Sequence, residues 1–229
     1  AIGDDIAFKE SWITKFDGIK KSAVLYDDVK RYRALRGRFE KDIGNLRKFG
    51  KFISTYFVPL NRCLSQAKTD GATKMEIQNI VSPVARNLSI LIRTLGKHDT
   101  SSGSEHESSL RAHKNLTDAI RLGIRNSGAL IFENEPPKTG AAGKGKESLK
   151  AQCIPESSLA PIQTDATKGL LDVPSMYVLN ALLFGAAGDA KQGLSVLRSK
   201  KDDFPYDINF NNFLALFALT DLKSHELGL

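Results

Sequence analysis

Apolar residues recur at three- and four-residue spacing along most of the chain, and few stretches show the alternation typical of strands. The first 24 residues carry Phe8, Trp12, Phe16 and Ile19 at this spacing, which predicts a helix over residues 4–24. Asp27 and Asp28 stand where an N-cap residue and a first-turn acid belong, so a second helix is expected to begin at about residue 29.

The second helix is predicted over residues 29–57, with Pro59 closing it. A third is predicted over residues 72–95, with a kink at Pro83, and a fourth over residues 105–126, with Gly128 as its stop. Because short loops join the four helices, we expect an antiparallel helical bundle over residues 1–133.

The pattern changes after residue 133. Residues 134–165 hold four prolines, three glycines and little apolar periodicity, as a linker or flexible arm does. Short helices are then predicted over about 166–171, 175–186, 189–200 and 208–222. The expected fold is all-α: a helical bundle, a linker and a C-terminal helical-hairpin subdomain over residues 166–229.

The C-terminal residues carry a spaced pattern of large and small side chains. Seven positions align in order with a W-x2-L-G-x2-Y, A-x3-F, P pattern: Tyr177, Asn180, Ala181, Phe184, Gly193, Leu197 and Pro205. Six of the seven match the pattern in side-chain size. The departure is Asn180, which stands where the pattern has Leu. Residues 174–222 therefore resemble one tetratricopeptide repeat and a capping helix, although a generic helical hairpin explains the same residues.

Such a repeat needs neighbours to bury its faces, so this unit is expected to pack either on the bundle or on another chain. The resemblance implies partner binding through helix faces and no catalysis. The residues expected to contact a partner are Tyr177, Phe184, Phe210, Phe213 and Phe217.

The net charge of +7 is unevenly placed along the chain. Residues 1–133 carry 23 Lys and Arg against 15 Asp and Glu, and the later segments are near neutral. In the second predicted helix the apolar stripe is Tyr32, Leu35, Phe39, Ile43, Leu46, Ile53 and Phe57. The opposite stripe consists of Lys30, Arg33, Gly37, Lys41, Gly44, Lys48 and Lys51.

A solvated face with tolerated glycines would explain the second stripe. The functional alternative is a polyanion-binding surface: Lys and Arg neutralise phosphates, and the two glycines admit a close backbone approach. The fourth predicted helix has a similar face, formed by Arg111, Lys114, Arg121 and Arg125. The sequence leaves open whether the two faces lie side by side.

Motifs that would indicate an enzyme are incomplete. The stretch GAAGKGKE follows the P-loop pattern up to its lysine, but Glu147 replaces the magnesium-binding hydroxyl and prolines precede it. Ser65 and Lys68 match S-x-x-K, and residues 138–140 match K-T-G, but no S-D-N lies between them and no sheet edge is predicted for K-T-G, so we interpret both matches as coincidence. His106 and His113 could share a helix face but are expected to be solvated, and Cys63 and Cys153 are expected to be free thiols. We expect no catalysis, no cofactor and no metal.

These patterns favour a non-enzymatic assembly protein that binds a polyanion, with RNA preferred, and docks on copies of itself or on other subunits. A nucleocapsid, a coat protein or a ribonucleoprotein component would have such a sequence. The alternative is a helical adaptor whose basic face meets acidic proteins or an anionic membrane surface. The N-terminus does not resemble a secretory signal, so we expect an intracellular protein, cytoplasmic or organellar, or a component of a viral or ribonucleoprotein particle.

Overall fold

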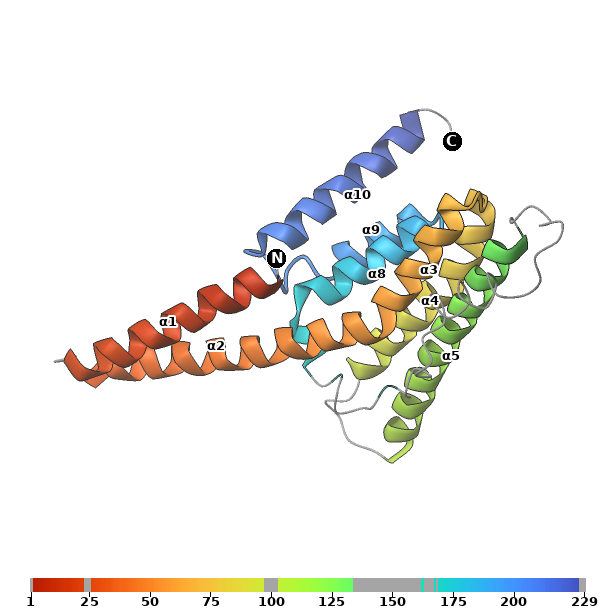
Figure 1. Ribbon diagram of the computed structural model, residues 1–229. Helices are drawn as coiled ribbons and strands as arrows, with labels where there is room; N and C mark the ends of the chain where they lie inside the picture. Colours follow the sequence, from red (N-terminus) through yellow and green to blue (C-terminus); the bar gives the residue numbers. More distant parts are fainter. Residues whose placement is uncertain are drawn as a thin grey trace.

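The first two helices form a hairpin that projects from the rest of the molecule (Figure 1). The computed structural model describes residues 2–22, 26–96, 103–133, 162, 167 and 169–226. Helix α1 (Ile2–Ser22) packs along α2 (Tyr26–Phe52) through aromatic side chains, with ring centroids 5.8 Å apart for Phe16 and Phe39. Because α2 already begins at Tyr26, Asp27 lies inside its first turn and the N-cap prediction is wrong.

The second helix does not end at Pro59. It passes through a π-helical segment, η1 (Ile53–Phe57), into α3 (Val58–Thr69), so one helical rod runs from α2 to the end of α3. Pro59 falls in the first turn of α3, where a proline costs no interior hydrogen bond, and this is why the predicted stop is wrong.

Helices α3, α4 (Lys74–Leu95) and α5 (Gly103–Glu133) pack side by side and contain much of the core. A capping box starts α4: Thr73 Oγ1 accepts from the Glu76 N–H at 3.3 Å, and the Thr73 N–H donates to Glu76 at 2.7 Å. Gly128 is buried inside α5 and does not stop it, because Ile131 beyond it is also buried in the core.

The C-terminal helices form a hairpin with a third helix laid on it. A 3₁₀ turn, η2 (Leu170–Asp172), leads into α8 (Pro174–Ala186), α9 (Ala190–Arg198) and α10 (Ile208–Glu226). The expected turn between α8 and α9 is present: Gly188 adopts φ +86°, and the Asp189 carboxylate accepts from the Gln192 N–H at 3.0 Å. A Cβ at Gly193 would lie 2.8 Å from the Ala181 carbonyl oxygen, so α8 and α9 cross closely there.

The C-terminal helices pack on the helices that precede them in the chain. Helix α8 lies against α4, η2 lies against α2, and one continuous apolar cluster runs from α2 to Phe217 of α10. Of the predicted linker only Ile162 is described; it is buried in this cluster, and its N–H donates to Thr117 Oγ1 at 3.3 Å. That residue therefore belongs to the core and not to a free arm. The all-α prediction is confirmed, since the described residues contain helices and no strand.

Candidate polyanion-binding surface

The basic stripe of α2 lies mostly on the molecular surface. Lys30, Arg33, Lys41, Lys48 and Lys51 are exposed. Gly37 is also exposed and Gly44 is half-buried, and a Cβ added at either would meet nothing within 4 Å. No contact inside the described protein therefore requires glycine at these two positions.

The first half of α2 carries cations that have no carboxylate partner among the described residues. Lys30, Arg31, Arg33 and Arg38 are exposed, and within the described ranges no ion pair joins any of them to a carboxylate. We call these four residues the basic patch. Their charges attract anions from solvent, because nothing in the described structure neutralises them.

Other cations of the hairpin hold its two helices together. Arg47 pairs with Glu10 at 2.6 Å, and Lys9 contacts Asp5 at 3.0 Å and Asp42 at 3.7 Å. Arg36 bridges Asp17 and Glu40, and its hydrogen bond to Glu40 raises the pKa of Arg36. The positive charges of Lys9, Arg36 and Arg47 are thus paired with carboxylates of the hairpin, which distinguishes these residues from the basic patch.

The second half of α2 meets η2. Lys41 Nζ lies 2.8 Å from Asp172, and this hydrogen bond raises the pKa of Lys41 above its ordinary value. One helical turn further along α2, Asn45 is buried. A Cβ added at Gly169 would lie 2.2 Å from Asn45 Oδ1, so the backbone of residue 169 approaches the Asn45 side chain closely. Lys41, predicted to bind a polyanion, therefore has a carboxylate partner inside the protein.

The basic face of α5 does not join that of α2. Arg111 lies 3.4 Å from Glu107, and Arg121 lies 3.7 Å from Asp118. Lys114 and Arg125 are exposed. Helices α2 and α5 are not packed against each other and diverge across the molecule (Figure 1). The two faces therefore line no common groove.

The aromatic residues expected to contact a partner lie mainly inside the protein. Tyr177, Phe184, Phe210 and Phe217 are buried, and Phe213 is half-buried. The Phe217 ring covers Gly185 and Gly193, so this side chain holds α10 on the α8–α9 hairpin. The four buried side chains are therefore not accessible to a partner in this structure.

A different set of α10 side chains is exposed. Ile208, Leu216 and Leu219 are 76%, 53% and 57% exposed, and residues 208–220 contain no charged side chain. The sequence signal for this outer face is the lack of charge in residues 208–220, which a prediction based on the aromatic side chains of α10 does not include. We call these three residues the outer face of α10.

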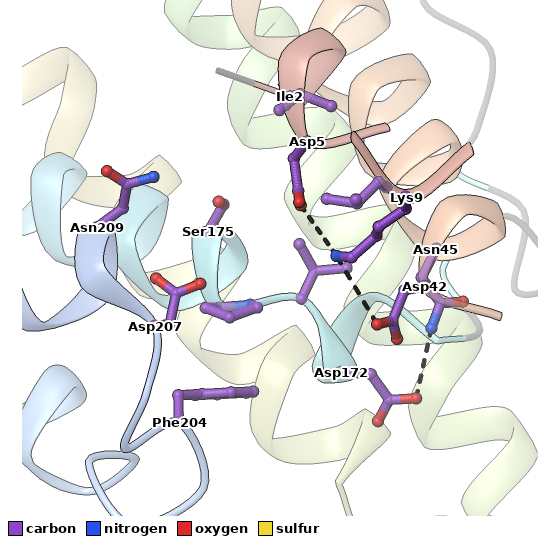
Figure 2. A pocket seen from close by; sticks show the side chains of 13 residues that line it. Ile2, Asp5, Lys9, Asp42, Asn45, Asp172, Ser175, Phe204, Asp207 and Asn209 are labelled. Atoms are coloured by element: carbon purple, nitrogen blue, oxygen red, sulfur yellow. Dashed lines mark hydrogen bonds and ion pairs between the residues drawn. The ribbon is translucent and has the colours of Figure 1, made fainter. Parts of the chain in front are cut away.

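A cavity of about 440 Å³ lies where α1, α2, η2 and the start of α10 meet (Figure 2). Asp5, Asp42, Asp172 and Asp207 line it, with Lys9 between Asp5 and Asp42. Its acidic lining disfavours an anionic ligand. Within the described ranges no three His, Cys, Asp or Glu side chains could hold a metal ion.

The remaining sequence motifs take ordinary structural roles where they are described. His113 is buried and not solvated as expected, with Nε2 3.2 Å from Thr167 Oγ1, while His106 is exposed. Ser65 and Lys68 lie on α3, and the Cys63 side chain is buried. The stretch GAAGKGKE and Cys153 fall outside the described residues.

Comparison with known proteins gives no match: no family model, curated protein or solved structure corresponds to the chain. Among the described helices, none combines the length and the hydropathy that crossing a bilayer requires.

Proposed function

We propose that this protein is a non-enzymatic assembly protein that binds RNA through the basic patch of α2 and self-associates through α10. The observation that carries the proposal is the set of four exposed cations on a projecting hairpin. They have no carboxylate partner among the described residues, in contrast to Arg36, Lys41 and Arg47 beside them. Phosphate neutralisation needs this kind of free cation and no base-reading side chain.

Self-association is supported by two uncharged surfaces on the same chain. One is the outer face of α10. The other is a cavity of about 400 Å³ between α3, α4 and α8, whose lining of mainly apolar side chains includes Val58, Leu64 and Leu182 and no charged residue. We propose that α10 of a second copy occupies this groove. Such a head-to-tail contact leaves one unused surface at each end, so it can extend into a chain of subunits.

RNA binding is tested on the purified full chain. The ratio of absorbance at 260 nm and 280 nm shows whether nucleic acid copurifies. Fluorescence anisotropy with a labelled single-stranded RNA over a salt series then gives the affinity. We expect affinity to fall as salt rises, with a slope of about 0.7 for each phosphate contacted.

The adaptor alternative is tested with the same preparation. Vesicles containing anionic phospholipid are offered in place of RNA and sedimented. Retention on the vesicles without measurable RNA affinity would replace RNA with a membrane surface as the ligand. Binding to neither would leave the basic patch without a polyanion and would contradict the proposal.

Replacing the glycines of α2 by alanine is predicted to raise the stability of the protein and to weaken its RNA binding. Gly37→Ala and Gly44→Ala should each raise the free energy of unfolding by about 1 kcal/mol, because alanine is the better helix former and nothing lies near either position. If RNA backbone approaches the helix there, the added methyl groups should weaken RNA binding several-fold. Urea denaturation and anisotropy measure the two effects. An unchanged RNA affinity would remove both glycines from the binding surface.

Charges on the outer face of α10 should prevent self-association. The double substitution Leu216→Glu with Leu219→Glu is expected to shift the protein to a monomer in light scattering, because carboxylates cannot enter an uncharged groove without a partner. Lys68→Glu on α3 changes the net charge by the same amount and should leave the assembly state unchanged. An unaltered assembly in the double variant would exclude this face as the contact.

A further inference from the structure

A third cavity lies between α4 and the α8–α9 hairpin. Its volume is about 730 Å³, within the range of roughly 300–1,000 Å³ of small-molecule sites. We call it the α4–α9 groove. Its charged lining consists of Arg86 and Arg93 from α4, Lys200 after α9, and Asp189.

The two arginines supply free positive charge. Arg86 and Arg93 are exposed, seven residues apart on one face of α4, and neither has a carboxylate partner in the described part of the chain; Arg86 donates to Ser82 Oγ at 3.0 Å. Lys200 pairs with Asp203 at 2.7 Å, and Asp189 caps α9. Planar guanidinium groups match phosphate oxygens in geometry, so this wall of the groove suits a phosphate group.

The inner wall holds an unsatisfied amide. Asn180 of α8 lines the groove and is 1% exposed, and its Oδ1 has no hydrogen-bond partner among the described residues. This is also the position where the helical-repeat pattern has Leu, and a leucine there would leave no polar atom unpaired. The Oδ1 atom lies just behind the groove surface, so a rotation of the Asn180 side chain would present it to a ligand with an N–H donor.

The rest of the lining suits a flat ring. Ile90, Phe184 and Val196 are apolar, while Gln192 and Ser195 offer further polar groups. Tyr177 stays neutral, since burial raises the pKa of its hydroxyl to about 12, and that hydroxyl donates to the Leu171 carbonyl at 3.1 Å. Phosphate, a ring with apolar faces and an edge with N–H donors occur together in a nucleotide.

We infer that the α4–α9 groove binds one nucleotide of the RNA strand, with Arg86 and Arg93 on its phosphate and the Asn180 amide on the edge of its base. The inference rests on the proposed function and adds base preference to it. The groove is close to α2, because Leu171 lines the groove while the next residue, Asp172, pairs with Lys41 of α2. A strand on the face of α2 therefore reaches the groove by crossing η2.

The test uses the full chain with two kinds of probe. Isothermal titration with the four nucleoside 5′-monophosphates and with inorganic phosphate measures the groove alone, and anisotropy with the RNA homohexamers measures the whole surface. We expect one base to be preferred by about tenfold or more, as a specific base contact provides, and inorganic phosphate to bind more weakly than the preferred monophosphate.

Two variants separate the groove from the basic patch. Asn180→Leu should abolish the base preference, preserve the salt slope and raise the melting temperature, because it removes the unpaired amide. Arg93→Glu, at an exposed position, should weaken monophosphate binding at least tenfold without changing the melting temperature.

Three outcomes would overturn the inference: no monophosphate binding by the wild type, an undiminished base preference in Asn180→Leu, or unchanged monophosphate binding in Arg93→Glu. If RNA hexamers still bind with a normal salt slope in any of these cases, the role of the basic patch stands and only the groove assignment fails. Loss of all RNA binding by the wild type would instead contradict the proposed function itself.

Discussion

Charge reversal in the basic patch, Arg33→Glu with Arg38→Glu, is expected to weaken RNA binding about 100-fold or more. Each substitution removes one exposed cation that has no carboxylate partner in the described structure and adds a repulsive carboxylate. A hydrogen bond to a charged group contributes about 1.5–3 kcal/mol, so each lost contact should cost at least tenfold in affinity. The salt slope should fall by about 1.4, that is, by about 0.7 for each phosphate contact.

The matched control is Lys68→Glu with Lys74→Glu, at the turn between α3 and α4. Both lysines are exposed, and both double variants lower the net charge from +7 to +3. The control should change RNA affinity by less than about threefold, because screening limits the effect of charges beyond roughly 10 Å. Equal losses in the two variants would show that net charge, and not the basic patch, drives binding. Arg33 and Arg38 are preferred to Lys41 because reversing Lys41 would also break its ion pair with Asp172.

Gly193→Ala is expected to lower the free energy of unfolding by about 1–3 kcal/mol, the usual cost of overfilling a packed core. The new Cβ would lie 2.5 Å from the Phe217 ring and 2.8 Å from the Ala181 carbonyl oxygen. The ring can rotate, but the carbonyl belongs to the backbone of α8, so the two helices have to separate. Urea denaturation followed by circular dichroism measures the loss.

Two further variants check the reason for this loss. Gly37→Ala makes the same chemical change on an exposed helix and should stabilise the protein, so a loss in Gly193→Ala cannot come from helix propensity. Adding Phe217→Leu to Gly193→Ala removes the ring contact but not the backbone contact, so it should recover little of the stability if the Ala181 carbonyl is the cause. A Gly193→Ala protein as stable as the wild type would show that α8 and α9 do not cross as closely as described.

The sequence predicts the helices well where side-chain spacing alone decides them. Phe8, Trp12 and Phe16 mark α1 to within two residues at each end, and Gly188 with Asp189 marks the turn before α9. The two wrong stops, Pro59 and Gly128, have different causes. Pro59 lies in the first turn of α3, where a helix tolerates proline. Gly128 weakens α5 locally, but packing on the core continues beyond it at Ile131, and tertiary contacts outweigh local propensity.

The candidate site is predicted only in part for a related reason. Helical periodicity shows which side chains share a face, so the exposure of Lys30 and Arg33 could be expected. It contains no information about which helices lie side by side. The pairing of Lys41 with Asp172 and the groove between Arg93 and Asn180 join segments more than 80 residues apart in the chain, and only the packed structure brings them together.

The π-helical segment Ile53–Phe57 has a consequence for how such a protein can change during evolution. A π turn accommodates one residue more than an α-helical turn, and each residue of an α-helix advances the chain by about 100°. Deleting one exposed residue there, such as Ser54, would therefore turn the whole α1–α2 hairpin by about that angle relative to α3. Insertions and deletions at this segment would reorient the basic patch relative to α3 while its four residues stay the same.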